Sequence, residues 1–133
     1  WFFQHVPHNE NPEAKSKPFI GAYTQGRATP YTIVFSMERA VHGKVVLRCA
    51  ICGTGTKELE IEVNGAKVGK IKDLSPDGVI TRHGTQGIWY ERNLCFDASL
   101  LRKGENKLII TVPAGSVNKG IMYDYIRLEL VEN

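Results

Sequence analysis

The sequence has no long hydrophobic run and no concentrated block of charge. No apolar stretch approaches the ~18 residues that a membrane-spanning helix needs, so we expect no membrane partner. The 17 basic and 14 acidic residues leave a formal net charge of +3. Because basic residues nowhere form a run of four, they do not supply the positive patch that nucleic acid binding requires, and we expect no nucleic acid partner.

The known signatures of catalytic sites are also missing. The sequence contains no GxSxG, no HExxH and no glycine-rich phosphate loop that leads into a helix. Its four histidines and scattered carboxylates are not joined by any motif. A hydrolase or lyase needs an acid, a base and a charge-stabilising group in one cleft. We therefore expect this chain, taken alone, to be non-catalytic.

Cysteine is scarce, since Cys49, Cys52 and Cys95 are the only three. Cys49 and Cys52 form a CxxC pair, which in other proteins indicates zinc or redox chemistry. Here the pair lies in the strand-like run VVLRCAICG, where positions three apart point to opposite faces. No second Cys or His pair has the spacing of a zinc site. We predict three buried, free thiols.

Helical periodicity is almost absent, whereas β-strand alternation recurs about every 10 to 15 residues, between turns rich in Gly, Asn, Asp and Pro. The run 44–53 is apolar on both faces, which is typical of a central strand. Asn64-Gly65 predicts a type I′ hairpin turn. The 133 residues suit one domain, and its first and last segments both read as strands, so we expect the chain ends to lie close together. The fold class is all-β, an antiparallel β-sandwich. Its predicted strands are residues 31–37, 44–53, 58–63, 66–72, 94–96, 107–113 and 126–131.

The residues most suited to binding a ligand flank an aromatic pair, Trp89-Tyr90. An aromatic ring can take the C–H face of a sugar, planar polar groups can take its hydroxyls, and Arg can pair with a uronate carboxylate. Neighbours on a strand face opposite ways, so one of the two aromatics is expected in the core, and the sequence leaves open which. The long, polar segment 5–30 adds further candidates. The predicted ligand-binding residues are Arg82, His83, Gln86, Trp89, Tyr90, Arg92, Arg27 and Tyr23.

Asp124 is an acidic residue in the terminal run YDYIRLEL. It shares strand parity with Ile126, Leu128 and Leu130, which predicts that it points inward and needs a partner. That partner is either the backbone N–H groups of a neighbouring loop, a cation such as Arg27, or a calcium ion with oxygen ligands.

The ordered run of segments resembles the C-terminal module of rhamnogalacturonan lyases of polysaccharide lyase family four. The segments that carry this resemblance span almost the whole chain: WFFQHVPHNENPEAK, GRATPYTIVF, LRCAICGTG, VNGAKVGKI, RHGTQGIWYER, LLRKGENKLIITVP and MYDYIRLEL. The resemblance implies a jelly roll similar to carbohydrate-binding modules, spanning residues 1–133. In such lyases a catalytic domain and a fibronectin-III-like domain precede it. Its first residue is Trp, not Met, so we expect a piece of a longer, microbially secreted protein that acts outside the cell or at its surface.

The family's lyases cleave rhamnosyl–galacturonate linkages by β-elimination with a Lys and a His of the first domain, which this chain does not contain. The resemblance therefore implies a non-catalytic module that binds pectic, uronate-containing plant cell-wall polysaccharide. The alternative is a structural domain that packs against the catalytic domain without binding sugar. Similar modules hold a structural calcium ion, the only cofactor suggested here, with Asp124 as one ligand and Glu10 or Glu13 as loosely matched others.

Overall fold

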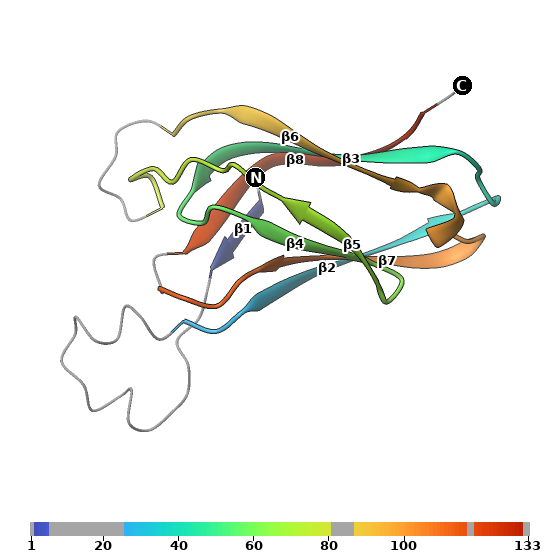
Figure 1. The fold of residues 1–133 in the computed structure, drawn as a ribbon, viewed down its shortest axis with the longest axis horizontal. Helices are drawn as coiled ribbons and strands as arrows, with labels where there is room; N and C mark the ends of the chain where they lie inside the picture. The colour runs from blue at the N-terminus through green and yellow to red at the C-terminus, as the bar shows by residue number, and fades with distance from the viewer. Residues whose placement is uncertain (1, 6–25, 81–86, 117–118, 132–133) are drawn as a thin grey trace.

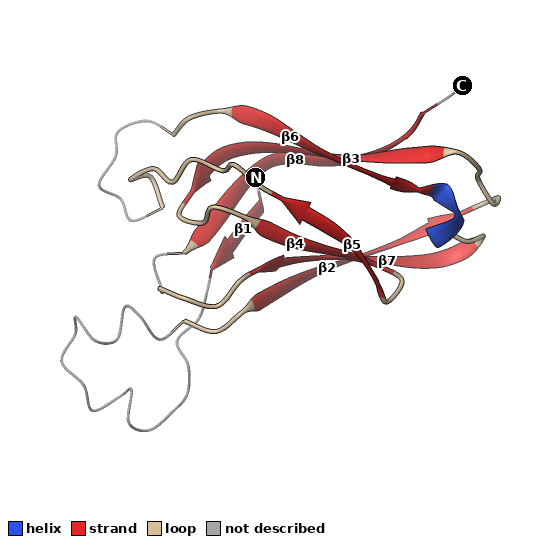
Figure 2. Ribbon diagram, in the orientation of Figure 1, coloured by secondary structure: helices blue, strands red, loops and turns tan. Residues whose placement is uncertain are grey.

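Two four-stranded antiparallel sheets stack face to face in the computed structural model, which describes residues 2–5, 26–80, 87–116 and 119–131 (Figure 1). The described chain is almost entirely strand and loop, apart from one 3₁₀ turn at Ala98–Leu100 (Figure 2). In that part of the chain, no helix is long and apolar enough to cross a membrane. The predicted all-β sandwich is confirmed.

The first sheet has the strand order β1-β8-β3-β6. Its members are β1 (Phe2–His5), β8 (Gly120–Val131), β3 (Lys44–Thr54) and β6 (Tyr90–Asp97). β3 pairs with a neighbour on each side, so the central position predicted from its apolar character is confirmed.

The second sheet has the order β2-β7-β4-β5. Its members are β2 (Thr29–Met37), β7 (Gly104–Val112), β4 (Leu59–Val63) and β5 (Ala66–Ile71). The β4–β5 turn has φ of 49° at Asn64 and 87° at Gly65. Positive φ at both positions is what a type I′ turn requires, so the predicted hairpin is confirmed.

The core fills the space between the sheets with side chains of alternating positions. On β4, Leu59, Ile61 and Val63 are buried while Glu60 is exposed, as period-2 alternation predicts. Burial of this apolar surface is the main favourable term in folding. The largest fully buried apolar side chains also include Leu47, Ile51, Ile110, Ile121 and Tyr123.

Gln4 is a polar side chain of β1 that joins the two sheets. It is 5% exposed, and its Nε2 donates to the carbonyl oxygens of Thr29 and, at 3.1 Å, of Ile110. Its Oε1 accepts a hydrogen bond from the Tyr123 hydroxyl at 3.1 Å. Because each polar atom of the amide has a partner, this buried group is compatible with the apolar core.

The expected proximity of the chain ends is wrong. Strands β1 and β8 are neighbours, because Phe2 pairs with Tyr123. However, β8 continues well beyond that pair to Val131, and each strand residue adds about 3.3 Å. The start of β1 and the end of β8 therefore lie apart (Figure 1).

The expected inward position of Asp124 is also wrong. Tyr125 pairs with Ala50, but the next pair along β3 is Ile51 with Tyr123, which leaves Asp124 as an extra residue in β8. Such a β-bulge reverses the parity of the strand. Ile126 on one side of it packs against the core, Tyr123 on the other side is fully buried, and Asp124 is exposed.

The three cysteines are free, as predicted, but they are not all buried. Cys49 is buried, Cys52 is partly buried and Cys95 is exposed. Cys95 lies on the outer face of β6, opposite Val46, which faces away from the second sheet.

Candidate functional site

Trp89 stands at the end of the sandwich where β3 ends and β6 and β8 begin. It immediately precedes β6, and its side chain is 56% exposed. The neighbouring Ile88 is also exposed. Large apolar side chains left in solvent on a rigid scaffold are typical of interaction sites. The sequence left open whether Trp89 or Tyr90 faces solvent, and in the structure Trp89 is the exposed residue.

The indole ring of Trp89 is held in a defined orientation by Asp124. Its Nε1 donates a hydrogen bond to Asp124 Oδ2 at 3.1 Å. The β8 bulge makes this contact possible, because it turns Asp124 outward at the same end of the sheet. The partner that the sequence required for Asp124 is therefore a tryptophan N–H group, which none of the predicted alternatives included.

Tyr90 and Arg92 connect the start of β6 to the segment that follows β5. The Tyr90 ring packs against the core, and its hydroxyl accepts a hydrogen bond from Ser75 N at 3.1 Å. Burial raises the pKa of the Tyr90 phenol, which keeps it neutral. Arg92 lies 4.6 Å from the centre of the Tyr90 ring and donates to the carbonyl of Asp73 at 3.0 Å. The expectation that one aromatic belongs to the core is confirmed for Tyr90.

Asp77 and Gly87 fix the backbone just before Trp89. The carboxylate of Asp77 accepts from the backbone N–H of Val79 at 3.1 Å and from that of Ile88 at 3.4 Å. A Cβ atom at Gly87 would lie 1.9 Å from the carbonyl oxygen of Cys52. Only glycine allows the segment to approach β3 this closely. Sequence reasoning missed both residues, although Pro76-Asp77-Gly78 is a recognisable turn.

The structure brings together only part of the predicted set. Trp89, Tyr90 and Arg92 are neighbours at this end, and Asp124 contacts Trp89. Arg27 is exposed and follows Gly26, which bridges to Gly115 of the β7–β8 connection. The remaining four residues, Arg82, His83, Gln86 and Tyr23, lie outside the described residues.

The outer face of the β8-β3-β6 layer carries a network of paired charges. Arg48 donates to Glu91 at 2.7 Å and to Glu129 at 3.0 Å. Tyr125 donates its hydroxyl to Glu91, and Arg127 pairs with Glu129 at 3.2 Å. The bonds from Tyr125 and Arg48 lower the pKa of the Glu91 carboxyl. Arg48 and Arg127 therefore already have carboxylate partners on this face.

Asp124 is the one candidate calcium ligand that lies within the described residues. Within the described ranges, no three His, Cys, Asp or Glu side chains gather closely enough to hold a metal. The other candidate ligands, Glu10 and Glu13, lie outside those ranges. Calcium binding at Asp124 stays a prediction.

The described strands form an antiparallel jelly-roll sandwich with an exposed aromatic held at its loop end, an architecture that carbohydrate-binding modules share with unrelated proteins. Comparison with protein families identifies the class of domain. The chain belongs to the family described as CBM-like, polysaccharide lyase family 4, domain III, whose model matches residues 1–128. This membership supports a carbohydrate-binding role and confirms that the chain itself is not an enzyme. No curated protein sequence matches the chain significantly.

Solved structures of similar fold include family 35 carbohydrate-binding modules. A module from Cellvibrio japonicus is 16% identical, with a TM-score of 0.51 over 95% of this chain and 83% of that one. One from an environmental isolate is 13% identical, with a TM-score of 0.52 over the same shares of 95% and 83%. One from Paenibacillus barcinonensis is 22% identical, with a TM-score of 0.50 over 83% and 74%. At these identities the likeness shows the fold.

Proposed function

We propose that this domain is a non-catalytic module that directs a pectin-degrading lyase to rhamnogalacturonan- or galacturonan-type polysaccharide. The parent protein would act outside the cell or at its surface, with catalytic and fibronectin-III-like domains in the same chain. Membership in the family of lyase third domains supports this role. The single observation that carries it is the exposed indole of Trp89, held by Asp124 at 3.1 Å.

A fixed indole is well suited to a sugar. Its flat face packs against the C–H groups of a pyranose ring, and little conformational entropy is lost because the ring is already oriented. The bond to Asp124 uses the indole N–H, so the apolar faces of the ring remain for the ligand. In this proposal Arg27 and Arg82 contact uronate carboxylates, Tyr23 adds a second aromatic ring for stacking, and His83 and Gln86 bind hydroxyl groups. Arg92 supports the site chiefly by holding the backbone at Asp73.

Titration calorimetry of the chain tests this function. The ligands are rhamnogalacturonan I, polygalacturonate and a neutral β-glucan, in about 50 mM salt. We expect saturable binding to the two pectic polymers and several-fold weaker binding in about 500 mM salt, because salt screens exposed charge contacts. Binding to the neutral glucan alone would contradict the pectic assignment, and no heat with any polymer would contradict the binding function.

Substitution of the aromatic locates the site. Trp89→Ala should weaken binding by about 1–3 kcal/mol, which is typical for loss of a central aromatic contact. Val34→Ala is the matched control, because Val34 is also exposed but lies on the second sheet, in β2. Equal affinity of the Trp89 variant and the wild type would place the site elsewhere on the surface.

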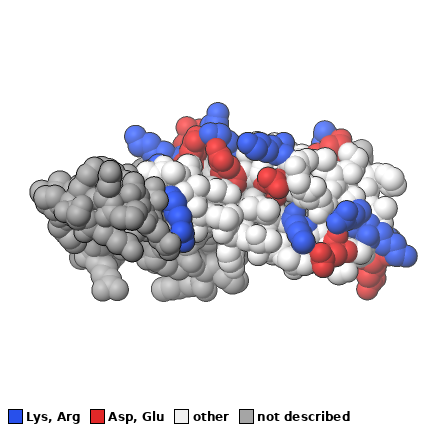
Figure 3. Space-filling view, turned by 90° about the horizontal axis from the view of Figure 1, so that it is seen from below, with Lys and Arg blue, Asp and Glu red and all other residues white. Residues whose placement is uncertain are grey.

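The outer face of the second sheet favours one alternative function, a structural domain that packs against the lyase catalytic domain. Positively and negatively charged side chains are interspersed with uncharged surface on this face (Figure 3), and Lys107 pairs with Val34 across β7 and β2. Val34 is 54% exposed there, and Ile109 on β7 is partly exposed. A separately produced catalytic domain should then co-elute with the wild-type chain in size-exclusion chromatography, and Val34→Asp should abolish co-elution. Separate elution would reject this alternative.

A further inference from the structure

A pocket lies at the same end of the sandwich as Trp89. It is an open pocket of about 410 Å³ between the β3–β4 connection, the β7–β8 connection and the segment after β5. Its wall includes Lys57, Lys119, Glu58, Thr56, Pro76 and Pro113. None of these residues was singled out by the sequence. The pocket therefore requires its own explanation.

The pocket has more positive than negative charge available to a ligand. Its one carboxylate, Glu58, is already bonded to Lys70 at 2.7 Å. In the described part of the chain, no carboxylate lies within ion-pair distance of Lys57 or Lys119. The hydrogen bond from Lys70 lowers the pKa of Glu58, and the charges of Lys72 and Lys119 act in the same direction. Glu58 therefore stays ionised and bonded to Lys70, while the ammonium groups of Lys57 and Lys119 can contact an anionic ligand.

The backbone positions the side chain of Lys119 and the main chain of Lys57. Lys119 Nζ donates to the carbonyl of Ala114 at 3.1 Å, and an ammonium group has further donors for a ligand. Its side chain lies across Gly115, where a Cβ atom would come within 2.7 Å of Lys119 Cε and Nζ. The carbonyl of Lys57 accepts a hydrogen bond from Leu74 N at 3.2 Å. The contacts of the Lys119 side chain reduce the entropy that its binding to an anion would otherwise cost.

The remaining wall suits a sugar ring. Pro76 and Pro113 are rigid and apolar, and they can contact C–H groups of a pyranose while the ammonium groups approach its carboxylate. A lysine recognises an anion as a point charge, so the geometry of the carboxylate need not be exact. A neutral sugar would gain only the proline contacts.

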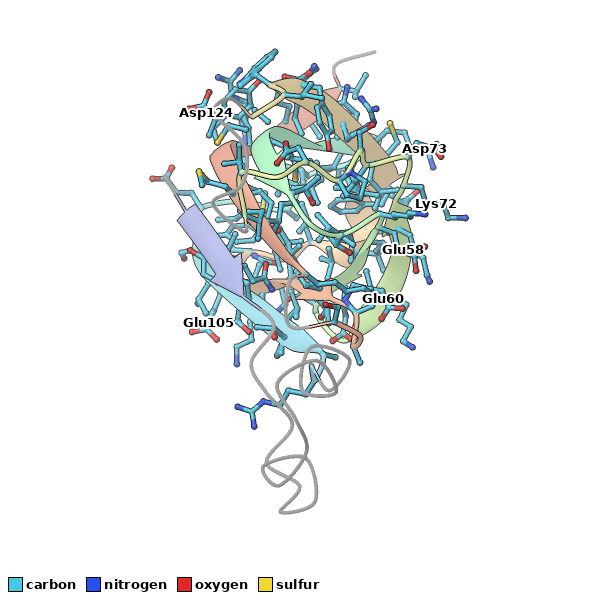
Figure 4. All side chains as sticks on the ribbon, turned by 90° about the vertical axis from the view of Figure 1, so that its left-hand side faces the viewer. Glu58, Glu60, Lys72, Asp73, Glu105 and Asp124 are labelled. Atoms are coloured by element: carbon cyan, nitrogen blue, oxygen red, sulfur yellow. The ribbon has the colours of Figure 1, made fainter. Side chains whose placement is uncertain are left out.

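The pocket is separate from the Trp89 site but adjacent to it. Viewed onto this end of the molecule, Glu58 and Lys72 lie at one margin and Asp124 lies near the opposite one (Figure 4). Between them runs the segment after β5, in which Pro76 lines the pocket and the next residue, Asp77, binds the backbone of Ile88. A polymer of several sugars can therefore contact both sites.

We infer that the pocket between Pro76 and Pro113 binds a carboxylate-bearing sugar, a uronate unit of the polysaccharide, with Lys57 and Lys119 as its cationic contacts. This rests on the proposed function for the polymer as a whole, and adds a second subsite that selects acidic over neutral or esterified units. The carboxylate is the chemical group that the pocket recognises.

The test compares trigalacturonate with its fully methyl-esterified form, using the whole chain. We expect the double variant Lys57→Gln/Lys119→Gln to bind trigalacturonate about 5- to 20-fold more weakly than the wild type, as two partly exposed charge contacts would give. Both proteins should bind the ester equally. Lys103→Gln is the matched control, because Lys103 is an exposed lysine next to the start of β7, the end of that strand away from the pocket. It should bind trigalacturonate like the wild type.

Nuclear magnetic resonance of the same samples separates the two sites. The backbone amide signals of Lys57 and Lys119 report on the pocket, and the indole N–H signal of Trp89 reports on the proposed site. If the indole signal shifts but the lysine variant binds trigalacturonate as Lys103→Gln does, the pocket is refuted and the module stands. If the pocket signals shift and the indole does not, the Trp89 site is refuted and the pocket stands. No shift with either ligand would overturn both.

Discussion

Gly87→Ala should disable the Trp89 site without touching its side chain. The new Cβ atom would lie 1.9 Å from the carbonyl oxygen of Cys52, whereas ordinary contact begins at 3.4 Å. Cys52 belongs to the central strand β3, which is held on both edges. The segment that contains Gly87 must therefore move away from β3 by about 1.5 Å. The Trp89–Asp124 bond, now 3.1 Å, would then exceed hydrogen-bond distance.

The expected loss equals the contribution of an oriented Trp89, about 1–3 kcal/mol or roughly 5- to 150-fold in affinity. Calorimetry against the best pectic ligand measures it, and thermal melting of the same variant checks that the two sheets remain folded. Ser75→Ala is the control, because Ser75 is exposed in the adjacent segment and only its backbone N–H is bonded. Wild-type affinity in the Gly87 variant would refute the reasoning that backbone approach orients the indole.

Three further predictions concern the rest of the domain. Gln4→Leu should lower the free energy of unfolding, measured in urea, by about 2–4 kcal/mol. The substitution leaves the buried Tyr123 hydroxyl and two carbonyl groups without their hydrogen-bond partner. A decrease below about 0.5 kcal/mol would show that water replaces the amide. An alkylating reagent should modify the exposed Cys95 first and Cys49 only on unfolding, as followed by mass spectrometry. Cys49 is buried, and burial raises its pKa to about 12. Rapid modification of Cys49 would instead show that β3 opens. The bond from Ser99 N, with a further contribution from Lys44, lowers the pKa of Asp97 to about 2. Its stabilising effect is therefore present above pH ~4 and lost as the pH falls toward 2, so the difference in melting temperature between wild type and Asp97→Asn should shrink over that range, and a constant difference would contradict the assignment.

Local sequence signals determined most of the fold. The alternation of Leu59, Ile61 and Val63 identified β4 and its buried face, because strand periodicity depends only on adjacent residues. Asn64-Gly65 identified the hairpin, since positive φ is a property of those residue types. The apolar run around Leu47 identified the central strand, because such a composition is typical of a strand that is paired along both edges.

Contacts between distant segments decided the site. The bulge at Asp124 exists because β8 has one more residue than β3 between two successive pairs, Ala50 with Tyr125 and Ile51 with Tyr123. The alternation within a single strand cannot reveal such an extra residue. Whether Trp89 or Tyr90 faced solvent depended on Ser75 and Asp124, which lie in other segments.

The sequence by itself therefore determined the all-β class, the strands and the hairpin, and the ordered motifs indicated the family. Only the tertiary structure decided that Trp89 is exposed and held by Asp124, and that Lys57 and Lys119 meet at one pocket although long stretches of sequence separate them. The physical reason is that alternation and turn propensity act between neighbours along the chain, whereas a binding surface is assembled from loops that the pairing of strands brings together.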